Sequence, residues 1–592
     1  MKLEEITALL GNFGRYQILL IAYASILSCI GCFVTLSHVF FAAGTDHWCS
    51  VLPHENCSSW PVFQDNCTEV KKAMFLPPSQ NDSSKYPYSN CDQWALPSEY
   101  VFDPYAPLAD VDNFTYSAVP CKSGWVYDTS QYKTTIISEF DLVCVDNDLP
   151  SFSQSIYFVG FLVSSIIVGT LSDWLGRKKA LSLSLLLWVV GFIVTTFSVN
   201  IYMYMAFRFI SGFGEYGAYL SSFVLAVENV PDSWRTAVTM LFGITYAVGY
   251  FFLATAAMYV REWRPLCLIM SLATVPLLFP LPFVQESISW LVSKDKLKEA
   301  DAVIRRVAKF NKKTLPDVLF DKEDDQNEME ARESAIPPSF IDLYRTPNMA
   351  VKTINMQYNW LVNSLVYYGL SLSTGDLGVD DYWAFFVSGA VEIPALVYAT
   401  FGVEWFGRKW NTAVLELIGG VACLVAIFIP IGIWRTVVSM IGKFCISATF
   451  SIIYLYSSEL FPTPIRAVGI GMCSVSSRIG GIISPLVLLL GRNVPSIVFG
   501  SSAIAAGILV FFLPETKGRK LPQTLKEAEA MGKCKCMTAN VSNESVIELD
   551  EVDLDKEGVF AISNAAFDHG EEKKCRDFSQ QFTRNHRESS HM

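Results

Sequence analysis

Long apolar stretches separated by polar segments recur along most of the chain. A helix needs about 20 mostly apolar residues to cross the hydrocarbon core of a bilayer. The windows that meet this requirement are 18–43, 150–171, 180–199, 201–227, 237–259, 264–284, 350–373, 382–402, 411–431, 435–457, 467–490 and 495–513. The pattern therefore predicts an all-α membrane protein with twelve transmembrane helices.

Four polar segments organise these windows: an N-terminus (1–17), a first loop (44–149), a charged central segment (285–349) and a tail (514–592). Helices 2–6 occupy 150–284 and helices 7–12 occupy 350–513, so the chain divides into two groups of six. Apolar residues at helical spacing predict an amphipathic helix from Lys296 to Phe310. The tail is polar and acidic, and we expect it to be largely disordered.

Lysine and arginine, which favour the cytoplasmic side of a membrane, predict the orientation. They follow the second and eighth windows and are frequent in the central segment. Those segments should be cytoplasmic, and an even number of spans then places both termini inside. The first apolar run is too long for a signal peptide and lacks a following A-x-A-like site, so we interpret it as a retained helix.

The first loop should therefore be extracellular, and its cysteines and sequons agree with that placement. An even number of cysteines in one loop predicts disulfides, which form in oxidising compartments. The candidates are Cys49, Cys57, Cys67, Cys91, Cys121 and Cys144. Four N-x-Ser/Thr sequons predict glycosylation at Asn56, Asn66, Asn81 and Asn113.

Composition excludes several other classes of protein. Hydrophobic residues make up 51% of the chain and charged residues 17%, against about 25% charged in soluble domains. The net charge of −12 lies largely in the tail and the central segment, and no basic tract with interleaved aromatics suggests nucleic-acid binding. The six histidines form no ligand pair, and no G-x-x-x-x-G-K-[ST] loop indicates ATP use. We expect neither a metal nor a cofactor.

A charged motif recurs in the two halves of the chain. Asp173-Trp-Leu-Gly-Arg177 follows the second window, and Glu404-Trp-Phe-Gly-Arg408 follows the eighth at the same spacing that relates Glu228 to Glu459 and Arg235 to Arg466. Such parallel repeats are typical of transporters whose substrate site lies between the halves near the bilayer midplane.

The motifs also resemble a known family. Asp173-x-x-Gly-Arg-Lys is similar to the signature of the major facilitator superfamily. Narrower stretches resemble the organic cation, organic anion and carnitine transporters: Leu10-Gly-Asn-Phe-Gly-Arg15, Glu139-Phe-Asp-Leu-Val-Cys144, Glu286-Ser-x-x-Trp290, Glu459-Leu-Phe-Pro-Thr and Leu513-Pro-Glu-Thr516. Within that family, Ser364-Leu-Val-Tyr-Tyr-Gly and Ser474-Val-Ser-Ser-Arg478-Ile-Gly-Gly most closely resemble the carnitine- and zwitterion-handling branch. Gln285 departs from the proline usual in that family.

The resemblance implies the major facilitator fold of two six-helix halves and a transporter rather than an enzyme. The expected substrates are small organic zwitterions or cations, such as carnitine-, betaine- or ergothioneine-like compounds, moved by alternating access at the plasma membrane. An organic anion transporter of the same fold and a non-transporting receptor or scaffold are the alternatives. Coupling to sodium or to protons stays open, as does the oligomeric state.

Charged residues inside spans are costly and are therefore candidates for function. Arg478 lies twelve residues beyond Arg466, about 18 Å into the membrane, and Glu392 lies at similar depth. We expect these two to pair in the empty protein. Lys443 and Glu215 are further intramembrane candidates.

Arg478 stands where cation-selective members of the resembled family usually carry aspartate and where anion and carnitine members carry arginine. A guanidinium binds a carboxylate through two hydrogen bonds, so the resemblance favours a carboxylate-bearing substrate. Aromatic rings hold quaternary ammonium groups, and Tyr367, Tyr454 and Tyr216 are candidates for that role.

The repeated charges at the cytoplasmic ends suit gating by ion-pair networks that hold the inner ends of the two halves together when the protein opens outward. The candidates are Asp173, Arg177, Glu228 and Arg235 in the first half, Glu404, Arg408, Glu459 and Arg466 in the second, and Glu286 and Glu515 just after the last helix of each half. Fixing the topology alone is the other interpretation.

Overall fold

The computed structural model describes residues 13–50, 123–316, 339–491 and 493–531, together with Leu10, Lys72 and the loop pieces 76–78, 88–95 and 117–121. Residues 1–521 form one compact unit, and 522–592 form a second, which is described only up to residue 531 and contains helix α20 (Leu525–Ala530). The predictions that fall outside the described residues are those for Cys57, Cys67, Asn56, Asn66, Asn81, Asn113 and the tail beyond 531.

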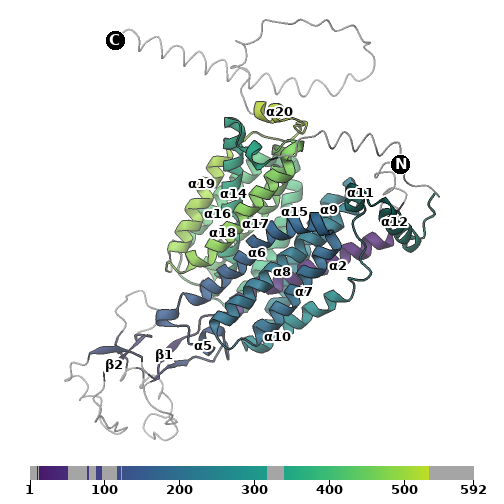
Figure 1. Ribbon diagram of the computed structural model, residues 1–592. Coiled ribbons are helices and arrows are strands. Elements are labelled where there is room, and N and C mark those ends of the chain that lie inside the picture. The colour runs from purple at the N-terminus through teal and green to yellow at the C-terminus, as the bar shows by residue number, and fades with distance from the viewer. Residues whose placement is uncertain are drawn as a thin grey trace, which may run out of the picture. The chain divides into compact units, whose positions relative to one another are not determined.

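The helices of the first unit form two bundles (Figure 1). The N-terminal bundle contains α2 (Arg15–Leu36), α3 (His38–Phe41), α6 (Leu149–Leu175), α7 (Arg177–Thr196), α8 (Ile201–Glu228), α9 (Asp232–Tyr259) and α10 (Trp263–Thr274), which continues into the 3₁₀ turn η4 (Val275–Leu278). The C-terminal bundle contains α14 (Pro347–Leu372), α15 (Asp381–Phe406), α16 (Arg408–Phe428), α17 (Ile433–Leu460), α18 (Arg466–Leu488) and α19 (Val494–Val510).

These helices correspond to the twelve predicted spans. Among the described residues, eight segments are long and apolar enough to cross a membrane by length and composition alone. The remaining four are α8 and α14, which are long but contain buried polar residues, and α10 and α19, which are shorter. The helix expected at 264–284 already ends at Leu278, where Pro280 and Pro282 lack the N–H groups that would extend it.

The repeated motif forms the same turn in both bundles. Gly176 is the C-cap of α6, and Gly407 is the C-cap of α15. Both glycines have positive φ angles, of 107° and 83°, which other residues rarely adopt. The carboxylate of Glu286 accepts the backbone N–H of Lys178 at the start of α7, and Glu515 accepts that of Arg408 at the start of α16. A carboxylate thus neutralises the positive end of each helix dipole.

The central segment contributes α11 (Ile288–Ser293) and α12 (Leu297–Asn311). Helix α12 buries one apolar face, as the spacing predicts, and its last residue anchors it to α2. The side-chain oxygen of Asn311 accepts the N–H of Tyr16 at 2.9 Å, and its amide nitrogen donates to Gln17 at 3.0 Å. The end of the bundles that carries this segment is called the linker end below.

The opposite end, called the loop end, carries two small antiparallel sheets that the all-α prediction missed. Strand β1 (His47–Cys49) pairs with β4 (Trp125–Tyr127), and β2 (Asp92–Trp94) pairs with β3 (Ala118–Pro120). The structure joins Cys49 to Cys121 and Cys91 to Cys144. With strands of only three residues, the disulfides supply much of the order of this loop.

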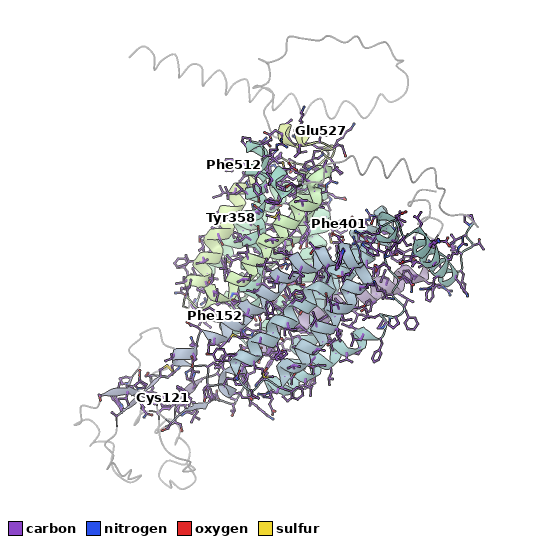
Figure 2. All side chains as sticks on the ribbon, viewed as in Figure 1. Cys121, Phe152, Tyr358, Phe401, Phe512 and Glu527 are labelled. Carbon is purple, nitrogen blue, oxygen red and sulfur yellow. A yellow bond between two sulfur atoms is a disulfide. The ribbon has the colours of Figure 1, made fainter. Side chains whose placement is uncertain are left out.

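Large apolar side chains point outward along the bundles (Figure 2). Phe152, Phe401 and Phe512, labelled there, are 43%, 52% and 74% exposed. In water such a surface would favour aggregation, whereas hydrocarbon is its natural solvent. The exposed faces therefore agree with a chain that spans a membrane.

The disulfides predict where thiols can be unmasked. Replacing Cys91 with serine should leave Cys144 as a free thiol. On intact cells, a membrane-impermeant maleimide should then label the variant more strongly than the unchanged protein. Cys423→Ser, which removes a buried thiol of α16, is the control and should add no label. Labelling of Cys91→Ser only after permeabilisation would place this loop on the cytoplasmic side.

Candidate functional site

The two bundles meet closely at the loop end. Tyr132 donates to Asp381 of α15 at 2.8 Å, and Tyr382 of α15 stacks on Phe40 of α3. Nearer the middle, Ser155 of α6 donates to the carbonyl of Ile482 in α18 at 2.8 Å. These contacts close the loop end of the interface between the bundles.

A buried ion pair lies deeper in this interface. Lys443 of α17 contacts Glu392 of α15 with a nitrogen to oxygen distance of 2.9 Å, and their side chains are 1% and 6% exposed. Tyr367 of α14 donates to the same carboxylate oxygen at 2.8 Å, and Lys443 lies 3.7 Å from the centre of its ring. Lys443 also donates to Tyr250 of α9 and to Ser371. Because Tyr250 belongs to the other bundle, this cluster ties the two halves together.

The partner of Glu392 differs from the expected one. The charge and depth of Arg478 suggested a pair with Glu392, but Lys443 occupies that position. The depth estimate could not give the direction in which each helix turns its side chains. Lys443, a flexible point charge, already neutralises the carboxylate and covers the ring of Tyr367.

Arg478 of α18 reaches across the interface to the N-terminal bundle instead. It donates to the hydroxyl of Tyr216 in α8 at 2.9 Å and lies 4.2 Å from the centre of that ring. Its Nε is buried without a hydrogen-bond partner, and no ion pair to it is found within the described part of the chain. A buried guanidinium that has only neutral partners is a ready site for an anionic group.

Further aromatic residues surround these two cations. Tyr216 stacks on Phe161 with ring centres 5.3 Å apart, and Tyr368 packs on Phe158 at 4.5 Å. Tyr454 lies on α17 with its ring 4.2 Å from Trp360, and it is 40% exposed. Tyr456 is fully buried and donates to the carbonyl of Pro514, so only Tyr454 of the two is free to contact a ligand.

Glu215 belongs to a separate polar network inside the N-terminal bundle. Thr35 of α2 donates to it at 2.6 Å, and Tyr157 of α6 donates to its other oxygen. Arg208, about two turns away on α8, lies over the ring of Tyr157 and donates to Gln154. The hydrogen bonds that Glu215 accepts from Thr35 and Tyr157 therefore stay within its own bundle.

Sequence reasoning missed Tyr250, Ser371, Tyr157 and Thr35. These uncharged residues are common in spanning helices. Neither the free-energy cost of burying a charge nor their rarity distinguishes them in the sequence. The costly charge of Arg208 was noticeable, but its partners were not. Only the way the helices face one another identifies them.

The repeated charges at the linker end form one network in each half. Arg177 contacts Asp173 at 2.7 Å and Glu228 at 3.2 Å. Arg408 contacts Glu459 at 2.8 Å, and Thr516 donates to the same glutamate. Each of these ion pairs stays within its own bundle, whereas the sequence predicted networks that hold the two halves together.

The other repeated residues differ between the halves. Arg466 donates to the carbonyl of Phe461 and to Thr463, whereas Glu404 and Arg235 are exposed. The symmetry of the sequence is therefore kept by the central arginine of each network and relaxed at its edges.

The comparisons with known proteins agree with this architecture. The family model described as "Sugar (and other) transporter" matches residues 110–527. The chain therefore belongs to this family of the major facilitator superfamily, and its relatives place it among the solute carrier family 22 transporters of organic ions. The predicted fold class and family are thereby confirmed.

Individual relatives include carriers with different names. The chain is 33% identical to human solute carrier family 22 member 13 over 89% of its length and 93% of that protein. It is 33% identical to human organic cation/carnitine transporter 2, over 88% of this chain and 93% of the relative. Rabbit organic anion transporter 3 is 32% identical, over 89% and 94%. These relatives are membrane transporters of small organic ions rather than enzymes.

The fold is that of solved major facilitator structures. The xylose transporter XylE from E. coli, in a partially occluded inward open conformation, aligns with a TM-score of 0.54 and 15% identity, over 86% of this chain and all of XylE. At that identity the likeness concerns the fold alone.

The buried pair gives a test of the site's electrostatics. Lys443→Met should destabilise the protein by about 3–5 kcal/mol, because it leaves Glu392 buried and unpaired, and Glu392→Gln should be costly for the converse reason. The double variant should recover most of the loss. The measurement is the thermal unfolding midpoint of all three in detergent. Equal, additive losses would mean that the two side chains do not interact.

The linker-end networks predict a different phenotype. Arg408→Gln should leave surface expression and equilibrium substrate binding largely intact but slow turnover several-fold, because the network sets the balance between conformations. Binding and uptake would be measured separately at matched surface level. Arg519→Gln, on the exposed segment after Glu515, is the control. Loss of binding in step with uptake would contradict a gating role.

Proposed function

We propose that this protein transports small organic ions that carry a carboxylate, with zwitterions of the carnitine or betaine type as the leading substrates. The observation that carries the proposal is Arg478, a buried guanidinium at the interface between the bundles whose hydrogen bond goes to a neutral hydroxyl. A substrate carboxylate would supply the missing counter-charge.

The aromatic side chains support a cationic group at the other end of the substrate. Tyr454 of α17 is 40% exposed and packs on the buried Trp360 of α14, and a quaternary ammonium gains about 0.5–2 kcal/mol from such a ring. The ring of Tyr367 is less available, since Lys443 already lies over it. The names of the carnitine-transporting relatives agree with this chemistry.

An organic anion is the second candidate, and one observation favours it. Glu392 would repel an anion if its charge were free, but Lys443 neutralises it. In the described part of this buried cluster, the two cations Lys443 and Arg478 then outnumber the carboxylate of Glu392. The similarity to an organic anion transporter points the same way.

The topology belongs to the proposal as well. The disulfide-bearing loop end should face the oxidising exterior, and the basic linker end should face the cytoplasm, with both termini inside. With the loop end closed by Tyr132 and Tyr382, the structure would then represent a state closed to the exterior. We place the protein in the plasma membrane and assign Arg177 and Arg408 to the inner gate.

Substrate selectivity tests the role of Arg478. Arg478→Asp should lower the ratio of carnitine uptake to tetraethylammonium uptake at least tenfold, because it removes the carboxylate partner and adds a repelling charge. Arg478→Lys should keep part of the activity with weaker affinity, since an ammonium lacks the planar fork. Lys309→Asp, a charge reversal on the exposed face of α12, is the control.

The outcomes separate the candidate substrates. If a dicarboxylate is taken up and carnitine is not, and Arg478→Asp abolishes that uptake, the anion alternative replaces the zwitterion. An unchanged ratio in Arg478→Asp at matched surface level would make Arg478 a structural charge and remove the main support for a carboxylate-bearing substrate.

A further inference from the structure

A second buried carboxylate lies away from the interface between the bundles. Glu416 of α16 is 0% exposed and lies eight residues beyond Arg408, about 12 Å into the membrane. One of its oxygens, Oε1, accepts a hydrogen bond from the amide nitrogen of Asn363 in α14 at 2.6 Å. The other, Oε2, is buried without a partner. Nothing in the transport mechanism described above uses this residue.

Asparagines continue the polar surface along α14. Asn355, Asn359 and Asn363 are four residues apart and share one face of the helix. Asn363 donates to the carbonyl of Asn359 at 3.0 Å, and Asn359 donates to Asn355. The side-chain oxygens of Asn359 and Asn363 are themselves buried without partners. The unsatisfied atoms around Glu416 are therefore oxygen acceptors.

No cation of the surrounding described helices pairs with Glu416. Helices α15, α17 and α19 pack against α16, and α14 packs against α17 and α19. Lys352 of α14 is a buried cation, but it lies eleven residues, about three helical turns, from Asn363. The ionisable groups nearest in depth on these helices and on α16 are Tyr358, Tyr398, Cys423, Cys445 and Lys443, and the hydroxyl of Tyr398 donates to Asn411. Helix α19 has none, and Lys443 contacts Glu392. No ion pair to Glu416 is found among the residues that the structure describes, and an ionised carboxylate there would be strongly destabilising.

We propose that Glu416 and Asn363 form a proton-binding site, occupied in this state, that makes transport respond to pH. The proton resides on Oε2 of Glu416 and is donated to Oδ1 of Asn363, while the Asn363 amide donates to Oε1. This cyclic acid and amide pair satisfies Oε2 of Glu416 and Oδ1 of Asn363 with a single proton. It also removes the charge that burial disfavours.

A metal cation fits the same atoms less well. Hard cations prefer about six oxygen ligands, whereas one oxygen of Glu416 here already accepts an N–H group. A proton needs only two oxygens. The site joins α14 to α16 within the C-terminal bundle, so loss of its proton would weaken the packing of α14, the helix that also carries Tyr367. Protonation would thereby influence the transport interface, whatever the substrate class.

Glu416→Gln imitates the protonated state, because its amide can both accept from and donate to Asn363. The unchanged protein in lipid should show an infrared C=O band of a protonated carboxylic acid that is missing from Glu416→Gln. The thermal midpoint of the unchanged protein should fall relative to that of Glu416→Gln between about pH 6 and about pH 8. The reason is that the folded state binds a proton that the unfolded chain releases, so the folding equilibrium constant should decrease about tenfold per pH unit until the site ionises. Glu299→Gln, on the exposed face of α12, should keep the unchanged behaviour.

Uptake completes the test. Substrate uptake by the unchanged protein should vary with pH, and Glu416→Gln should flatten that profile at least several-fold while it retains transport at acidic pH. Identical pH profiles, or an infrared band that survives in Glu416→Gln, would overturn the proposal. A sodium-dependent rise of the thermal midpoint that disappears in Glu416→Gln would also overturn it, because the site would then take sodium. A variant that fails to reach the surface would be replaced by Asn363→Leu, which removes the proton acceptor and should also shift the profile.

Discussion

The cost of an uncompensated charge in hydrocarbon determines how this protein is arranged. The intramembrane charges described above are compensated in different ways. Lys443 and Glu392 neutralise each other, Glu215 accepts from two hydroxyl groups near Arg208, and Glu416 faces an amide. Arg478 reaches across the interface between the bundles and faces a phenol and aromatic rings there. The proposed substrate site lies at this charge because, among the described residues, it faces the other bundle without a counter-charge.

The same constraint explains why much of the fold could be predicted. Helices in lipid must satisfy their own backbone groups, so span length and apolar composition were enough to locate the helices. The repeat 231 residues apart located the two halves. The strands β1 to β4 escaped prediction because three-residue strands between disulfides carry no periodic signal.

The site was predictable only in part. The rarity of charges singled out Arg478, Glu392 and Lys443, but their partners depend on helix rotation and on contacts between different helices. Tyr250 illustrates the limit, since nothing in the sequence distinguishes it from its neighbour Tyr246. Its contact with Tyr367 exists only because α9 and α14 meet.

The carboxylate caps at the two helix starts have a consequence for evolution. Glu286 caps the start of α7, and Glu515 caps the start of α16. Each half therefore has its own helix cap, supplied by a residue of that half. Because both halves carry the same cap, a six-helix unit whose duplication produced them would already have carried it. Afterwards, selection could tune the substrate path along the seam between the copies without disturbing what keeps either copy intact.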